Sequence, residues 1–134
     1  MRPFFFLFLV LALLIISCKK SSLNTTIPIG TYKGTFQRSI MNKVSNVTLQ
    51  FSSNSYKGQS DSIHYPDICK GSFSISKDTV SFTNTCFYTA NFDWTYILDR
   101  KYKISVFGDS LIMTREYNGF VYYFDTYKLK KQKI

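Results

Sequence analysis

The chain divides into two stretches with different patterns of apolar and polar residues. Residues 4–16 form an unbroken apolar run, whereas from Gly30 onward apolar and polar residues alternate in short runs separated by turn signals. Alternation with a period of two is typical of β-strands that have one buried face. We expect strands at 31–38, 44–53, 55–61, 70–76, 79–86, 93–98, 101–107, 110–117 and 120–130.

The short connections between these strands predict an antiparallel meander. Strands that follow one another in sequence with tight turns are usually neighbours in the sheet. A meander of eight or nine strands leaves two exposed edges unless it closes on itself. We therefore expect an all-β domain, a single antiparallel up-and-down β-barrel of about eight strands. The alternative is a two-sheet β-sandwich.

The hairpin around Lys77-Asp78 has the best-defined register. Symmetric pairing about a two-residue loop places Phe73 opposite Phe82 and Ile75 opposite Val80. The same register places Cys69 opposite Cys86, in a non-hydrogen-bonded pair, where side chains approach most closely. That geometry suits a disulfide.

Two further hairpins are indicated by Gly108-Asp109 and Asn118-Gly119. The first pairs Ile104 with Met113 on an apolar face. The second, taken as a two-residue turn, turns Lys128 inward and Leu129 outward, which contradicts the apolar face. A bulge between residues 124 and 128 would repair the conflict.

The apolar run at the start has the layout of a bacterial lipoprotein signal peptide. Arg2 precedes it, and Cys18 follows it directly before Lys19 and Lys20. A membrane-spanning helix needs about 20 apolar residues, whereas a signal peptide needs about 7–15. We expect residues 1–17 to be removed, Cys18 to be diacylated, and the protein to be held by lipid at the cell envelope, most simply at the outer membrane.

Lipidation of Cys18 also explains the number of cysteines. Three cysteines in an exported chain would leave one thiol over after one disulfide, whereas an acylated Cys18 leaves Cys69 and Cys86 as a pair. Residues 18–29 read as a polar tether and residues 30–134 as one domain.

The mature chain is basic and its composition favours strands. It keeps 16 of the 17 basic residues and all eight acidic ones, a net charge of +8. The basic residues are scattered, apart from Lys128, Lys130, Lys131 and Lys133. This pattern indicates a solvated surface with a soft preference for anionic membrane rather than a specific anion site. A nucleic-acid partner is not expected for an exported protein that carries no nucleic-acid-binding motif.

Several short motifs together carry a resemblance to a known family. They are Cys18 with its lysines, Gly30-x-Tyr32-x-Gly34, Asp67-x-Cys69-x-Gly71, Asn84-x-Cys86, Phe92-Asp93-Trp94, Gly108-Asp109 and Tyr127-x-Leu129. With these motifs the chain resembles the small lipocalin-like lipoproteins of Bacteroidota over most of residues 30–130. True lipocalins open with Gly-x-Trp, and here Tyr32 stands at the place of the tryptophan. The resemblance implies a calycin-type barrel on a membrane anchor, and it transfers no catalytic or ligand-binding residue.

The same resemblance implies O-glycosylation. Bacteroidota attach O-glycans at Asp-Ser/Thr before an aliphatic residue, and Ser62, Thr79 and Ser110 each stand in that context. Asp followed by Ser or Thr is also what tight turns favour, so the turn explanation is sufficient for two of these three sites.

Nothing in the sequence indicates catalysis, a metal or a cofactor. His64 is the single histidine, and with Asp61 or Asp67 it falls short of a zinc site. The residues best placed to line a barrel mouth are Tyr32, Asp93 and Trp94. Trp94 serves there either as a stacking surface for a ligand or as a plug that closes the barrel, and we favour the plug.

Two non-enzymatic functions follow from these expectations. One is a barrel that binds a small apolar or amphiphilic molecule in an interior cavity of at least about 300 Å³. The other is a structural or interaction protein whose outer face or rim binds an envelope protein and which has no cavity. Complete filling of the barrel would exclude the first, and the residues expected to fill it are Phe36, Leu49, Phe51, Phe73, Phe82, Ile104 and Met113.

Overall fold

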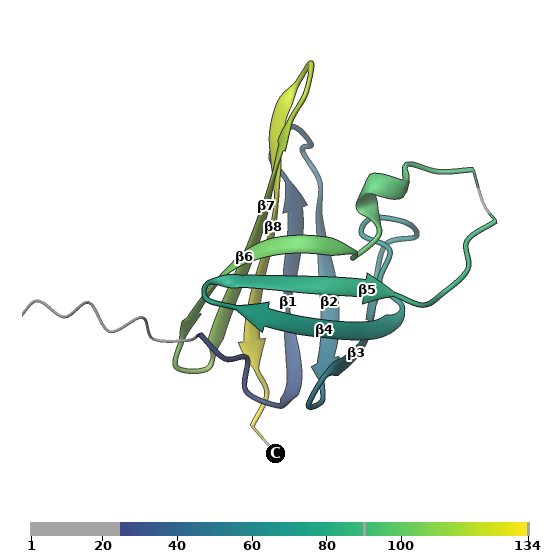
Figure 1. Ribbon diagram of the computed structural model, residues 1–134. Helices are drawn as coiled ribbons and strands as arrows, with labels where there is room; N and C mark the ends of the chain where they lie inside the picture. The colour runs from purple at the N-terminus through teal and green to yellow at the C-terminus, as the bar shows by residue number, and fades with distance from the viewer. Residues whose placement is uncertain (1–24, 90, 134) are drawn as a thin grey trace, which may run out of the picture.

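Eight antiparallel strands form the protein, and the last strand pairs with the first. The computed structural model describes residues 25–89 and 91–133, so the predicted signal peptide and Cys18 lie outside the described residues. Each strand pairs with the next and β8 pairs with β1, which closes the barrel (Figure 1). The strands are β1 (Gly30–Arg38), β2 (Val44–Phe51), β3 (Ser55–Ser60), β4 (Lys70–Ser76), β5 (Thr79–Asn84), β6 (Arg100–Phe107), β7 (Ser110–Asn118) and β8 (Tyr122–Lys131).

The closed barrel confirms the predicted fold and excludes the two-sheet sandwich. One predicted strand is wrong: residues 93–98 contain the short 3-10 helix η2 (Trp94–Tyr96) rather than a strand. Asp93 caps this helix, because its side chain accepts a hydrogen bond from the backbone N–H of Thr95 at 2.9 Å.

The two ends of the barrel differ in their connections. At one end, which we call the turn end, lie the turns between β2 and β3, β4 and β5, and β6 and β7, together with the described start of the chain. At the other, the loop end, lie residues 39–43, 61–69, 85–99 and the tip of the β7–β8 hairpin. Any site built from loops is therefore at the loop end.

Side chains fill the barrel interior. Alternate residues of each strand point inward, and large aromatic rings pack edge to face, such as Tyr32 with Phe51 at 5.5 Å between centroids. The buried inward-facing residues include Tyr32, Phe36, Leu49, Phe51, Val80, Phe82, Tyr102, Ile104, Leu111, Met113, Tyr127 and Leu129, none more than 4 % exposed.

Two glycines allow strands to approach more closely than any side chain would permit. A Cβ at Gly34 would lie 1.9 Å from the carbonyl oxygen of Lys128, and one at Gly71 would lie 2.0 Å from that of Thr83. These contacts explain why Gly34 and Gly71 interrupt rows of large inward-facing residues in β1 and β4.

The β7–β8 hairpin resolves the conflict in the last strand. Asn118 pairs with Tyr122, so the loop has three residues rather than two. Met113 then lies opposite Tyr127, and both Tyr127 and Leu129 point into the core. The predicted two-residue turn at Asn118-Gly119 is therefore wrong, and the register needs no bulge to keep Lys128 outside.

The chain enters the barrel at the turn end. Ile27 is buried against the core, and the hydroxyl of Tyr32 donates to the carbonyl oxygen of Pro28 at 2.8 Å. The backbone N–H of Thr25 donates to the carbonyl oxygen of Lys77 at 3.3 Å. The described part of the predicted tether, residues 25–29, thus packs on the barrel.

Candidate functional site

A buried ion pair lies at the loop end of the barrel. Arg38 at the end of β1 is the register partner of Asp125 in β8. Nε of Arg38 donates to Oδ1 of Asp125 at 2.7 Å, and a terminal guanidinium nitrogen donates to Oδ2 at 2.9 Å. The two side chains are only 3 % and 1 % exposed. A bidentate pair of this kind fixes the orientation of the guanidinium plane.

Three tyrosine rings surround the guanidinium of Arg38. Its central carbon lies 3.8 Å from the ring centroid of Tyr96, 4.5 Å from that of Tyr123 and 5.3 Å from that of Tyr117. Burial alone would lower the pKa of Arg38, but the hydrogen bond and charge of Asp125 outweigh it and raise the pKa. Arg38 is therefore permanently cationic, as the aromatic rings favour.

Asp93 belongs to the same cluster. Its carboxylate accepts hydrogen bonds from the Thr95 hydroxyl at 2.7 Å and from Arg38 at 3.3 Å. Burial would raise the pKa of Asp93, but the hydrogen bonds from Thr95 and the charge of Arg38 hold it below the ordinary value. Through these contacts Asp93 holds its own loop against Arg38 at the end of β1.

The loops 61–69 and 85–99 pack together at the loop end, and we call their described residues the cap. The backbone N–H of Asp67 donates to the carbonyl oxygen of Tyr96 at 3.0 Å, and that of Leu98 donates to the carbonyl oxygen of Asp67 at 2.9 Å. The ring of His64, paired with Asp67, stacks on Phe92 with 4.0 Å between centroids. The cap is thus one connected structure.

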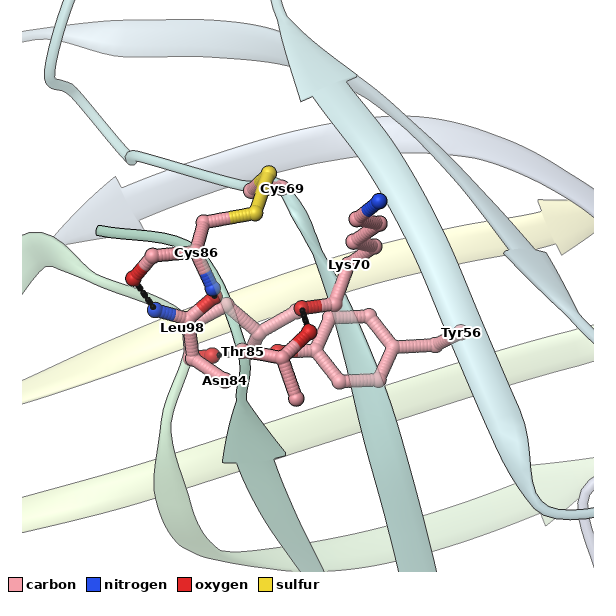
Figure 2. Close-up of a disulfide and its surroundings, with 7 residues drawn as sticks. All are labelled: Tyr56, Cys69, Lys70, Asn84, Thr85, Cys86 and Leu98. Carbon is pink, nitrogen blue, oxygen red and sulfur yellow. Dashed lines mark hydrogen bonds between the residues drawn. A yellow bond between two sulfur atoms is a disulfide. The ribbon is translucent and has the colours of Figure 1, made fainter.

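The disulfide between Cys69 and Cys86 joins the two loops of the cap where they leave β4 and β5. The Cα atoms are 6.4 Å apart, and the register of β4 and β5 is the predicted one. Figure 2 shows the surrounding hydrogen bonds, among them the Thr85 hydroxyl donating to the carbonyl oxygen of Lys70 at 3.1 Å. The hydroxyl of Tyr56 reaches from inside the barrel to the carbonyl oxygen of Leu98 at 2.8 Å. The predicted disulfide is confirmed.

The residues predicted to line or plug the mouth lie in different places. Trp94 is 59 % exposed, so it does not plug the barrel. At this end of the barrel the rings of Tyr65 and Tyr96 pack against Phe36, and the guanidinium of Arg38 lies over Tyr96. Tyr32 is buried near the turn end, six residues and so about 20 Å along β1 from Arg38, which contacts Asp93.

The three predicted glycosylation residues are all partly exposed. The hydroxyl of Thr79 donates to its neighbour Asp78 at 3.2 Å, and that of Ser62 to Asp61 at 3.3 Å. Ser110 opens β7 directly after the β6–β7 turn.

An exposed apolar surface extends over the tip of the β7–β8 hairpin and the neighbouring β1–β2 loop. We call it the tip surface. The backbone N–H of Ser39 donates to the carbonyl oxygen of Phe124 at 2.9 Å, which joins the two segments. Phe120 is fully exposed at its apex. The members of the tip surface are Ile40, Met41, Val44, Phe120, Val121, Tyr122 and Phe124, each at least 40 % exposed.

Five hollows lie outside the barrel, on the part of the chain that the structure describes. Those on the outer face of the sheet measure about 360 to 500 Å³ and are lined mostly by polar side chains such as Gln50 and Lys57. One of about 370 Å³ lies at the loop end, between the disulfide and η2. The seven side chains expected to fill the interior all lie in the core or pack against it.

Within residues 25–89 and 91–133, no group of three or more His, Cys, Asp or Glu side chains is placed to hold a metal ion.

No helix in the part of the chain that the structure describes is long and apolar enough to cross a membrane.

Comparisons with family models, with curated proteins and with solved structures give no match for this chain. The function is therefore argued from the geometry alone.

The sequence analysis missed Arg38 and Asp125. Arg38 follows the inward positions 32, 34 and 36, so the alternation of β1 could have identified it as an inward-facing cation. Asp125 could not be identified, because the two-residue turn assumed at residues 118–119 turned it outward.

Proposed function

We propose that this protein is a non-enzymatic, lipid-anchored module of the bacterial cell envelope that binds a partner protein with its tip surface. The observation that carries the proposal is the contrast between a filled barrel interior and an exposed apolar hairpin at the loop end. A filled interior leaves no space for the apolar ligand that a lipocalin-like barrel would otherwise hold. A gathering of exposed apolar side chains at one end of a domain marks an interaction site.

The position of the anchor directs the tip surface away from the membrane. Six residues lie between the proposed lipid-bearing Cys18 and Thr25 at the turn end, and the seven Cα–Cα steps from Cys18 to Thr25 span at most about 25 Å. Lys77, Lys130 and Lys131 lie at this same end, where they complement anionic headgroups. The loop end then faces outward from the lipid surface.

The shape of the tip surface favours a protein as the partner. The β7–β8 hairpin projects beyond the rest of the barrel as a convex finger (Figure 1). A convex apolar finger buries its side chains only when another surface supplies a concave groove, as proteins do. Because the proposed anchor at Cys18 and the lysines of the turn end favour a lipid surface at the opposite end, we assign the finger to a protein groove.

A site-specific crosslinking experiment tests this function. A photoreactive phenylalanine analogue replaces Phe120 in the full-length protein, expressed in a Bacteroidota host. The control replaces Phe107, which is also largely exposed but lies at the turn end. We expect one defined protein adduct from position 120, none from position 107, and loss of the adduct when Tyr122→Ser and Phe124→Ser are added. Equal adducts from both positions, or none from position 120, would refute the proposal.

The lipid anchor has its own test. Metabolic labelling with palmitate is expected to mark the wild-type protein and not the Cys18→Ser variant. A mature protein that is cleaved but unlabelled would contradict the anchor while leaving the crosslinking result independent.

A further inference from the structure

The groove at the loop end has two exposed aromatic walls. It measures about 370 Å³ and lies between the segment after β5 and the helix η2. Phe87 is fully exposed on one side and Trp94 is 59 % exposed on the other. Large rings are normally covered in a folded domain, so two exposed rings flanking one hollow indicate a surface for a flat ligand.

The polar groups in this groove are held in fixed positions. The guanidinium of Arg115 donates to the carbonyl oxygens of Asp99 at 3.0 Å and Thr95 at 3.3 Å. Its central carbon lies 4.2 Å from the ring centroid of Tyr117. One oxygen of the Asp99 carboxylate accepts from the backbone N–H of Asn84 at 3.2 Å, so the other can accept from a ligand hydroxyl. The floor of the groove is therefore preorganised.

Arg100 supplies a second guanidinium at the edge of the groove. Its backbone has a φ of 69°, a left-handed conformation that is unfavourable for a residue with a Cβ. Such strained residues concentrate at functional sites. Among the residues that line the groove, two guanidinium groups oppose one carboxylate, so the groove carries a net positive charge.

We propose that this groove binds an acidic saccharide. The C–H face of a sugar ring is apolar and stacks on an aromatic ring such as Phe87 or Trp94, while the hydroxyls at its edge need donors and acceptors. Arg115 and Asp99 provide both kinds of group. A uronate carboxylate pairs with Arg100. This binding activity goes beyond the proposed partner binding, because it uses no residue of the tip surface.

Trp94 gives a direct measurement of binding, because it is the only tryptophan of the sequence. The mature protein with intact disulfide is titrated with tetragalacturonic acid while its fluorescence is recorded. We expect a saturable change with this probe and a weaker one with neutral maltotetraose. Sulfate and benzoate test whether a simple anion or an aromatic acid is sufficient. Saturation by either at equal or lower concentration, or no saturable change with the uronate, would overturn the proposal.

Three variants locate the binding. Phe87→Ala removes one wall, and Arg100→Gly removes the charge while tolerating the positive φ. Each is expected to weaken uronate binding about tenfold, which corresponds to about 1.4 kcal/mol. Phe107→Ala, an exposed aromatic at the turn end, is the matched control and should leave binding unchanged. Unchanged affinity in both groove variants, with the fold intact by circular dichroism, would show that the saccharide binds elsewhere.

Discussion

Arg38 and Asp125 bring two charges into a site from which water is excluded. Removing a charge from water is costly, and the attraction between the partners offsets that cost only with good geometry. Burial raises the pKa of Asp125, although the hydrogen bonds and charge of Arg38 act in the opposite direction. The pair also holds Thr95 and Asp93 of the cap through Arg38. We interpret it as a device that fixes the position of the cap rather than as a source of stability.

Breaking the pair is expected to destabilise the protein strongly. Arg38→Met leaves Asp125 buried without its partner, and we expect a loss of about 3–5 kcal/mol of unfolding free energy at neutral pH, measured by urea denaturation. The double variant Arg38→Met/Asp125→Leu should be considerably more stable than the single one, since it leaves no buried charge. A single variant within about 1 kcal/mol of the wild type would contradict this account.

The lowered pKa of Asp93 predicts how the cap responds to acid. Its pKa is lowered in the folded protein, so its contribution to stability is fully present above the unfolded value of 3.8 and is lost as the pH falls through the lower folded value. Asp125 acts in the opposite sense, because its raised pKa favours the folded state at low pH. Acid should therefore loosen the cap at Asp93 first.

Trp94, next to Asp93, reports this loosening. We expect a reversible change in its fluorescence below about pH 4, at pH values where far-ultraviolet circular dichroism still shows the barrel. The Asp93→Asn variant carries no titrating group at this position and should lack the transition. An identical transition in Asp93→Asn would assign the change to another group.

At the scale of the elements, the disulfide adds a covalent link to two loops that also contact each other through hydrogen bonds and ring stacking. It closes a loop of 17 residues, for which the chain-entropy model gives about 3 kcal/mol. We expect the double variant Cys69→Ala/Cys86→Ala to lose about this free energy of unfolding. Reduction of the wild type should lower its urea midpoint to that of the variant. A midpoint that does not change on reduction would refute a structural role.

The hairpins show which parts of the register can be predicted from sequence. The sequence predicts the β4–β5 and β6–β7 registers correctly. Each hairpin has a two-residue turn, and close to the turn an apolar residue of one strand faces an apolar residue of the other. At the β7–β8 hairpin, Asn118-Gly119 was an equally strong turn signal, but the loop includes Phe120 and Val121. The core decided this register, since it buries Tyr127 and Leu129 and leaves Lys128 in solvent.

The candidate sites were less predictable than the fold for a physical reason. Arg38 and Asp125 are 87 residues apart, and only the closure of β1 on β8 brings them together. Residues 93–98 alternate as a strand would. Asp93 nevertheless caps the helix η2, and Ile97 pairs with Asp67 of the other loop, so these residues form a short helix and loop instead. Tertiary contacts of this kind leave no signal in local periodicity.

At the scale of the whole molecule, the packing of large side chains in the core argues against a ligand inside the barrel. Native mass spectrometry of the mature protein from its own host should give the mass of the chain with its covalent lipid and any glycan. No stoichiometric non-covalent apolar molecule is expected, because the inward positions are occupied by side chains. A bound fatty acid or similar molecule at one per chain would contradict the assignment.

Both ends of the described chain lie at the turn end (Figure 1). The backbone N–H of Gln132 donates to the carbonyl oxygen of Thr31 at 2.8 Å. A short linker could therefore join them into a ring, which could be reopened between Gly119 and Val121 without removing a strand. Such a circular permutant would carry its lipid at the opposite pole and stand inverted on the membrane. The fold and the direction in which it faces would then be separable properties of one sequence.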